Sequence, residues 1–266
     1  MRSVTRPSVR GACLIATVAA AACAHGRTGA PDQTPYAAPS AGPAPTAPVA
    51  AGAPIDTVGL PRVRFARGTT SGILDDSLAA GATRSYLVGA RQGQVMLAHA
   101  IAWPVAERLH PPPEPVVRVF SAATGAELHS PRAEPEVWSA RLPADGDYVV
   151  RVTAGAPTTY TLAVQIPREV MVSADQPTAI FTGTAPSRGP IDYLIRAEAG
   201  RTLEVILGGA PTVGLHVYGL ADGAQLARLA DRQRLYAGRV ATTQDYVVSV
   251  VPGAERAAYD LRITLR

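Results

Sequence analysis

The stretch Asp147-Tyr-Val-Val-Arg-Val152 recurs 98 residues later as Asp245-Tyr-Val-Val-Ser-Val250. A second stretch, Tyr160-Thr-Leu-Ala-Val-Gln-Ile166, recurs at an offset of 99 residues as Tyr259-Asp-Leu-Arg-Ile-Thr-Leu265. In the last of these, apolar side chains alternate strictly with polar ones, which is the period of a strand with one buried and one wet face. The two pairs predict that the chain contains two similar halves built from β-strands.

Three more matches, in the same order, extend this internal repeat. They are residues 86–93 with 193–200, residues 117–128 with 215–226, and residues 138–142 with 236–240. The offset is 107 residues in the first match and 98 in the other two. This drop places a nine-residue insertion in the first copy, between Gly93 and Val117.

Turn-forming glycines separate the apolar runs at the spacing usual for β-sandwiches. We therefore expect an all-β chain with two tandem antiparallel β-sandwiches of jelly-roll type, residues 59–167 and 168–266. One window, residues 224–235, consists of good helix formers. Its counterpart in the first copy carries Pro131 and Pro135, which a helix interior rejects. A strand, a loop and a second strand are expected there, with room for a short helical turn.

Residues 1–22 are typical of a bacterial signal peptide. Arg2, Arg6 and Arg10 form a positive region, and residues 11–22 form an apolar stretch too short to span a bilayer. Small residues directly before Cys23 resemble the lipobox of bacterial lipoproteins, although Ala20 stands where Leu is usual. The resemblance implies a lipid anchor at Cys23 and an outer-membrane lipoprotein that faces the periplasm. The alternative is ordinary cleavage after Ala22, which leaves a soluble periplasmic protein.

Residues 23–58 carry the expected lipidated Cys23 and then a segment rich in Pro and Ala. Such a composition buries little apolar surface and favours extended polyproline II, so we expect a disordered linker. The only cysteines are Cys13, inside the leader, and Cys23. The exported part therefore has no disulfide, and its stability must come from buried cores.

The charge balance argues against a nucleic-acid partner. All 25 basic residues are arginines, and three of them lie in the leader. From Cys23 onward 22 arginines stand against 21 acidic residues, which leaves a net charge of only +1. Nucleic-acid binding needs a concentrated positive face.

The repeated motifs resemble those of a known family. The first copy has Tyr86-Leu-Val-Gly-Ala-Arg-Gln-Gly93, then Leu142-Pro143 and Gly146-Asp147-Tyr148, then the alternating strand at 160–166. This pattern resembles the bacterial pre-peptidase C-terminal domain and the similar periplasmic inhibitors of goose-type lysozyme. The second copy departs from it, with Val240-Ala241 and Gln244 at the corresponding positions. The resemblance implies a β-sandwich with a binding role, and it carries over no binding residue.

Catalytic and metal-binding motifs are absent from the sequence. There is no G-x-S-x-G, no H-E-x-x-H and no Walker-type glycine loop. The five histidines are spaced unlike any metal site. Asp75-Asp76 and Asp145-Gly-Asp147 contain the oxygen ligands that Ca²⁺ takes, but Asp-Gly-Asp is also ordinary turn chemistry. We expect no enzyme, no metal and no cofactor.

The insertion in the first copy carries the candidate binding residues. Trp103, Arg108 and His110 lie in or beside it, next to three consecutive prolines. Trp and Arg are the residue types that anchor protein interfaces. The alternative for Trp103 is a packing role at one end of the sandwich. We therefore expect Trp103, Arg108 and His110 to form part of a partner-binding edge.

Two functional hypotheses follow. In the first, the chain is a non-catalytic envelope lipoprotein that binds a protein partner in the periplasm, such as a lysozyme that it occludes. In the second, it is a carbohydrate- or peptidoglycan-binding module in which an aromatic ring stacks on sugars. An accessory subunit of an envelope complex is a third, weaker hypothesis. The first is favoured by family resemblance, which is an association and not a mechanism.

Overall fold

The computed structural model describes residues 52–103, 114–130 and 137–266. All of them fall in one compact unit, Ala47–Arg266. The predicted leader, the lipidation site Cys23, most of the predicted linker, Arg108 and His110 lie outside the described residues. Within the described part of the chain, no helix is long and apolar enough to cross a membrane.

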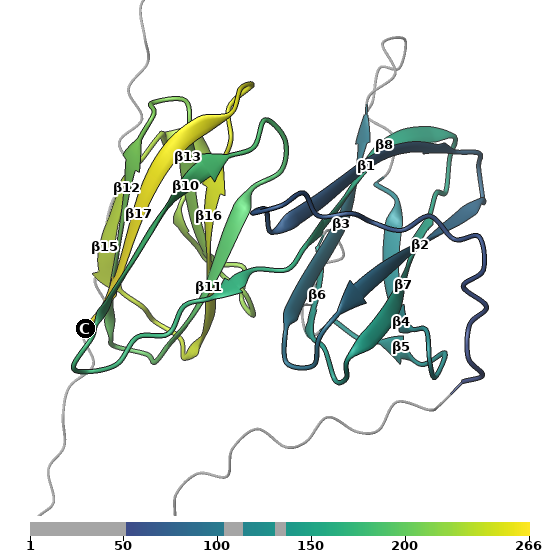
Figure 1. Cartoon of the computed structure of the whole chain (residues 1–266), viewed down its shortest axis with the longest axis horizontal. Helices are drawn as coiled ribbons and strands as arrows, with labels where there is room; N and C mark the ends of the chain where they lie inside the picture. The colour runs from purple at the N-terminus through teal and green to yellow at the C-terminus, as the bar shows by residue number, and fades with distance from the viewer. Residues whose placement is uncertain (1–51, 104–113, 131–136) are drawn as a thin grey trace, which may run out of the picture. The chain divides into compact units, whose positions relative to one another are not determined.

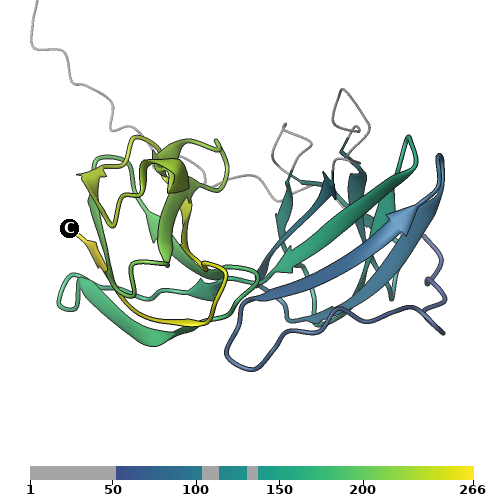
Figure 2. The same cartoon turned by 90° about the horizontal axis from the view of Figure 1, so that it is seen from above.

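The first copy forms two four-stranded sheets (Figures 1 and 2). One sheet has the order β1-β8-β3-β6 and the other has the order β2-β7-β4-β5. The strands are β1 (Ser71–Leu78), β2 (Thr83–Ala90), β3 (Val95–Trp103), β4 (Val116–Ser121), β5 (Glu127–Leu128), β6 (Trp138–Arg141), β7 (Gly146–Thr153) and β8 (Thr158–Gln165).

The second copy repeats this order, with sheets β10-β17-β12-β15 and β14-β13-β16-β11-β9. Its strands are β9 (Arg168–Glu169), β10 (Thr178–Ala185), β11 (Ile191–Ala197), β12 (Thr202–Gly209), β13 (Gly214–Gly219), β14 (Gln225–Ala227), β15 (Leu235–Arg239), β16 (Gln244–Val251) and β17 (Ala257–Leu265). Among the described strands, the pairs are antiparallel apart from β9 with β11. The prediction of two antiparallel β-sandwiches is confirmed, because each strand of the first copy has its counterpart at the predicted offset.

Residues 224–235, which have helical propensity, fold as the repeat predicts. They contain β14, a single 3-10 turn at Leu229–Asp231, and the first residue of β15. Arg232, directly after the turn, has a positive φ of 51°. Tertiary pairing of the flanking strands therefore overrides the local helix propensity.

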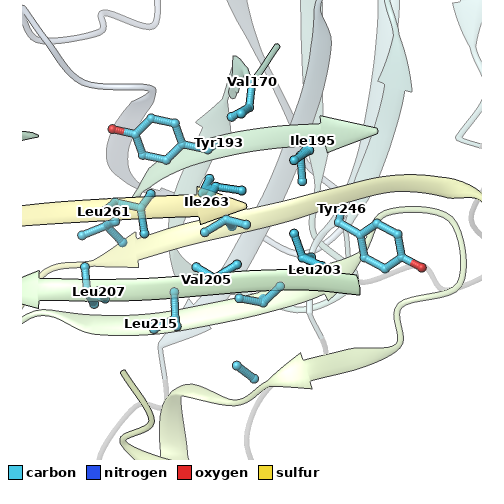
Figure 3. Packing of buried hydrophobic residues seen from close by; sticks show 14 of the residues in the cluster. Val170, Tyr193, Ile195, Leu203, Val205, Leu207, Leu215, Tyr246, Leu261 and Ile263 are labelled. Carbon is cyan, nitrogen blue, oxygen red and sulfur yellow. The ribbon is translucent and has the colours of Figure 1, made fainter. Parts of the chain in front are cut away.

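Each sandwich buries its own core between its two sheets. In the second copy the inward residues of β11, β12, β16 and β17 pack together, and Figure 3 shows Tyr193, Leu203, Tyr246 and Leu261 among them. The equivalent inward residues of the first copy form the other core, which includes Tyr86, Met96, Tyr148 and Leu162. The period of two seen in the sequence is therefore the inward and outward alternation of real strands.

Equivalent tyrosines close the same turn in both copies. The hydroxyl of Tyr148 donates to the carbonyl of Ala144 at 2.6 Å, and that of Tyr246 donates to the carbonyl of Thr242 at 2.7 Å. Both carbonyls lie four residues upstream, in the turn before the strand. The buried phenol therefore satisfies its polar end locally, as a buried Tyr must.

Part of the predicted linker contacts the first sandwich. The backbone N–H of Ile55 donates to the carbonyl of Ala122 at 2.9 Å. Ile55 and Leu60 also pack on Leu87 and Val149, on the outward face of the sheet β2-β7-β4-β5. Ile55 lies within residues 23–58, whose composition predicts a disordered linker. It is partly buried because it packs on the apolar face formed by Leu87 and Val149.

Candidate binding face

Trp103, the last residue of β3, lies on an outward sheet face and not in the core. Its side chain is 54% exposed, and Ile101 on the same face is 48% exposed. Inward residues alternate with them, since Ala100 and Ala102 are buried. The alternative packing role for Trp103 at one end of the sandwich is therefore not what the structure shows.

A chain of hydrogen bonds fixes the indole of Trp103. Its Nε1–H donates to the Oγ1 atom of Thr161 on β8 at 2.8 Å. The Thr161 hydroxyl donates in turn to a carboxylate oxygen of Asp75 on β1 at 2.6 Å. Asp75 accepts two further bonds, both of 2.8 Å, from the guanidinium of Arg188. Three neighbouring strands and one loop of the second copy thus hold one exposed aromatic ring.

The pairing register explains why these residues meet. Asp75 lies opposite Thr161 in the β1–β8 pair, and Ile101 lies opposite Thr161 in the β3–β8 pair. Trp103 lies opposite Thr159 in the next row. We call the surface formed by Ile101, Trp103, Thr159, Thr161 and Asp75 the Trp103 face.

The electrostatics of the Trp103 face are set by Arg188. Two hydrogen bonds from its guanidinium, and then the bond from Thr161, lower the pKa of Asp75 to about 2. Asp75 therefore stays ionised across the physiological pH range. A lowered pKa on an exposed carboxylate reports a well-formed ion pair and adds little stability by itself.

The end of the insertion is anchored beside this face. A carboxylate oxygen of Glu114 accepts a hydrogen bond of 2.7 Å from the backbone N–H of Ala102. Ala102 is the neighbour of both Ile101 and Trp103 in β3. Glu114, the first described residue after Trp103, is therefore held beside Ile101 and Trp103.

The acidic pairs whose oxygens could serve Ca²⁺ have other partners in the structure. Asp76 accepts bonds from Arg84 and from the hydroxyl of Tyr86. Asp145 accepts a bond from the backbone N–H of Gln92, and Asp147 is held by Arg62. Within the described residues there is no group of three or more His, Cys, Asp or Glu side chains arranged to hold a metal ion.

The two described strand histidines differ in environment. His99 is largely buried, which lowers its pKa, and its Nδ1 atom has no hydrogen-bond partner in the described part of the chain. The Nε2 atom of His216 is hydrogen-bonded to the side-chain oxygen of Gln225. His99 lies on the same outward side of β3 as Ile101 and Trp103, next to the Trp103 face, whereas His216 lies on β13 of the second copy.

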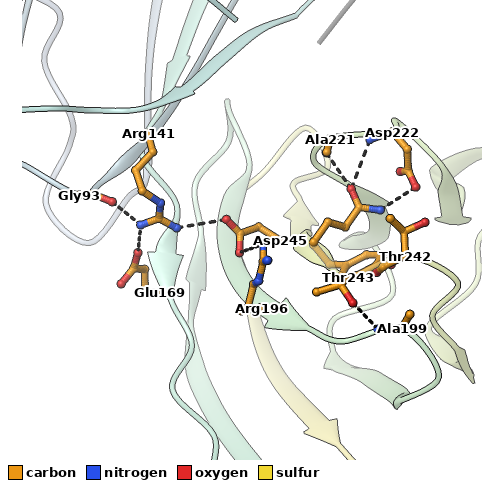
Figure 4. Close-up of polar contacts among 12 residues, drawn as sticks. Gly93, Arg141, Glu169, Arg196, Ala199, Ala221, Asp222, Thr242, Thr243 and Asp245 are labelled. Carbon is orange, nitrogen blue, oxygen red and sulfur yellow. Dashed lines mark hydrogen bonds and ion pairs between the residues drawn. The ribbon is translucent and has the colours of Figure 1, made fainter. Parts of the chain in front are cut away.

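A second polar cluster, which the sequence did not reveal, joins the two copies (Figure 4). Arg141 at the end of β6 bonds to Glu169 at 2.8 Å and to Asp245 at 3.1 Å. Its guanidinium also donates to the carbonyl of Gly93. An open cavity of about 380 Å³ beside it is lined by Arg141, Glu169, Arg196 and Asp245 together with apolar residues. Opposite charges here neutralise one another, so the cluster is a structural link and offers no net charge to a ligand.

Comparison with known proteins gives likeness of structure only. No protein-family model matches the chain, and no curated relative matches it. Among solved structures, PliG of Aeromonas hydrophila, a periplasmic inhibitor of g-type lysozyme, is 17% identical, with a TM-score of 0.32 over 38% of this chain and 96% of its own. PliG of Salmonella Typhimurium gives 16% identity, a TM-score of 0.31, and 37% and 96% coverage. The CUB1-EGF-CUB2 region of human MASP-1/3 gives 9% identity, a TM-score of 0.24, and 74% and 100% coverage. The function must therefore rest on the geometry of the Trp103 face itself.

Proposed function

We propose that the chain is a non-catalytic binding protein of the cell envelope and that the Trp103 face is its contact surface. The observation that carries this is the indole of Trp103, which is half exposed and yet held by the bonds through Thr161 and Asp75 to Arg188. An exposed side chain that changes rotamer freely loses entropy when a partner fixes it. A ring that is already ordered loses little entropy when a partner covers it.

A protein partner fits the composition of this face. Trp and Arg are enriched among residues that dominate interface energetics, and a central aromatic anchor surrounded by polar groups is the usual arrangement. Trp103 and Ile101 supply the apolar centre, while Asp75, Thr161 and Arg188 supply a polar rim. The proposal includes lipid anchoring at Cys23 and a periplasmic location, with a lysozyme as the partner to test first.

The test uses the purified chain in a turbidity assay of cell-wall lysis by a goose-type lysozyme. The proposal expects the chain to slow clearing and the Trp103→Ala variant to lose most of that effect. Met171→Ala is the matched control, because Met171 is 85% exposed and lies on the second copy. Clearing indistinguishable from buffer at high molar excess would refute the lysozyme as partner.

Glycan binding is the second candidate, and the polar groups beside the exposed indole favour it. A ring tethered at its Nε1 edge, beside the hydroxyl of Thr161, can stack on a sugar while neighbouring polar groups bond to its hydroxyls. Pelleting of the chain with isolated peptidoglycan separates the two candidates. Co-sedimentation that Trp103→Ala abolishes, without inhibition of lysis, supports the glycan; inhibition without co-sedimentation supports the protein partner.

A further inference from the structure

The two sandwiches contact each other through unlike sheet faces. The first contributes the outward side of β1-β8-β3-β6, which we call its leading face; the second contributes the outward side of β14-β13-β16-β11, its receiving face. The buried contact joins Val95, Leu97 and Val137 of the leading face to Leu194, Tyr218, Leu220 and Val247 of the receiving face. These are all aliphatic or aromatic side chains.

The first sandwich carries the same receiving face on β2, β4 and β7. By the offsets of the repeat, the counterparts of Leu194, Tyr218, Leu220 and Val247 are Leu87, Phe120, Ala122 and Val149. These four residues form a cluster of their own. Here no sheet covers them; the chain's own residues 55–60 do so, through Ile55 and Leu60. A short segment thus occupies the position that a whole sandwich occupies in the second copy.

An arginine completes both contacts at the same place. Arg141 binds Asp245 on the second receiving face, and Arg62 binds the equivalent Asp147 with two bonds of 2.8 Å. Arg62 lies beside Leu87 in a parallel bridge, as Glu169 lies beside Leu194. The segment before β1 therefore makes the same two kinds of contact on the first receiving face as the leading face makes on the second, namely an apolar contact and an arginine–aspartate pair.

In the part of the chain that the structure describes, the leading face of the second sandwich is exposed. Ile180, Arg262, Ile206 and Leu235 lie opposite one another in one row across β10, β17, β12 and β15. Ile180 is 64% exposed and Leu235 is 55% exposed. Leu235 is the counterpart of Val137, and the exposed Arg239 is the counterpart of Arg141. Within the described residues, Arg239 forms no salt bridge.

From this relation we propose that the open leading face of the second sandwich docks on the receiving face of the first sandwich of another copy of the chain. Leu235 would take the place of Val137 over Leu87 and Val149, with Ile206 beside it, and residues 55–60 would be displaced. The contact would use the same two faces as the one within the chain, with Thr202 and Glu204 standing where the first copy has Val95 and Leu97. An exposed apolar row of this kind is a common mark of an interaction surface.

The charges on the two faces also differ between the copies. On the first receiving face, Arg62 and Arg151 stand where the second has Glu169 and Ser249, so this face is more basic. On the open leading face, Glu204 stands where the first copy has Leu97. A carboxylate has thus been gained on the face that would meet the added arginines. Arg239 would approach Asp147, as Arg141 approaches Asp245, but it would also face Arg62, which stands where Arg141 meets Glu169.

The geometry of such a contact is head to tail. A single contact between unlike faces is heterologous and extends into a ring or an open row, whereas two copies that exchange both contacts about a two-fold axis form a closed dimer. Every added copy must also displace Ile55 and Leu60 from a surface that they already cover. The association is therefore expected to be weak and to depend on concentration.

Sedimentation velocity of the purified full chain tests the proposal. The mean sedimentation coefficient should rise with protein concentration, and Leu235→Glu should remove that rise. Leu229→Glu is the control, because Leu229 is also exposed but lies in the 3-10 turn, outside the row. Ile55→Gly should strengthen association, since it loosens the covering segment.

Each outcome decides the matter. A sedimentation coefficient that stays that of a monomer at every concentration, for the chain and for Ile55→Gly, overturns the proposal. So does association that Leu235→Glu leaves unchanged, or association that Trp103→Ala abolishes instead. A circular dichroism spectrum of Leu235→Glu that matches the parent shows that loss of association is not loss of fold.

Discussion

The Nη2 atom of Arg141 lies 3.1 Å from the Oδ2 atom of Asp245 and so ties the last residue of β6 in one sandwich to the start of β16 in the other. Asp245 is the counterpart of Asp147 in the repeat. Each aspartate forms an ion pair with an arginine from outside its own sheet. The two copies therefore keep the aspartate at the same position, but the arginine that pairs with it comes from a different part of the chain in each copy.

Replacing Arg141 should weaken the link between the sandwiches. Arg141→Met keeps the apolar stem but removes the bonds to Glu169 and Asp245. The side chain of Arg141 is 48% exposed, so a loss of only about 1 kcal/mol in the free energy of unfolding is expected. Urea denaturation measures it. Arg118→Met is the control, since Arg118 pairs with Glu127 at 3.8 Å within one sandwich, and equal losses from both variants would contradict the role of Arg141.

Thr161→Val should release the indole of Trp103 without altering the shape of the sheet. The chain has two tryptophans, and Trp138 is buried, so fluorescence quenching by iodide reports mainly on Trp103. Quenching should increase in Thr161→Val because the bond to Nε1 is lost. Thr159→Val, on the same face and opposite Trp103, should leave quenching unchanged. Identical quenching of both variants would show that the hydrogen bond does not hold the ring.

Asp192 should make stability fall as the pH rises. Burial raises its pKa from 3.8 to about 7, opposed by the hydroxyl of Ser249, and both carboxylate oxygens lack a close partner within the described residues. The folded chain therefore retains a proton that the unfolded chain releases. The contribution is complete below about pH 4 and is lost as the pH passes 7, by at most about 4 kcal/mol.

The variant Asp192→Asn isolates this effect. It should lack that part of the decline and become more stable than the parent above pH 7. His99 acts in the opposite direction, because burial lowers its pKa, but it is common to both proteins and cancels in their difference. Thermal unfolding measured from pH 4 to pH 8 supplies the difference. A constant difference across this range would rule out titration of Asp192.

The buried tyrosine pair of the second core should show strong coupling. The hydroxyls of Tyr193 and Tyr259 lie 2.7 Å apart, and both rings are buried. Tyr193→Phe leaves the other hydroxyl without this bond, at a cost of about 1–3 kcal/mol. The double variant, with Tyr259→Phe added, should cost less than the sum of the two single ones. Additive losses in urea denaturation would mean that the bond contributes nothing.

The sequence predicts the fold well, because strand order depends on features that repeat. Alternation in residues 259–265 gives inward and outward faces directly, and the matched landmarks carry the topology from one copy to the other. Pro131 and Pro135 in the first copy exclude a helix there, and the repeat extends this prediction to residues 224–235 of the second copy. The strand-and-turn structure of residues 224–235 is predicted from these prolines and not from the helix propensity of the residues themselves.

The contacts between elements could not be predicted in the same way. Leu87 and Leu194 read as ordinary members of apolar runs, and nothing local shows that they face outward or that different partners cover them. Asp75 and Arg188 are 113 residues apart and meet only because of how the two copies pack. Trp103 stands out in the sequence because its insertion breaks the repeat, but nothing in the sequence indicates the hydrogen bonds that hold its indole.

Hydrogen exchange of the chain with and without its partner tests the central claim most directly. The probe is a goose-type lysozyme or isolated peptidoglycan, whichever the two binding assays select. The account predicts new protection in β3 and β8 around Ile101, Trp103 and Thr161, and none when Trp103→Ala is mixed with the same probe. Protection confined to the second sandwich, or binding that leaves β3 and β8 exchanging at the free rate, would contradict it.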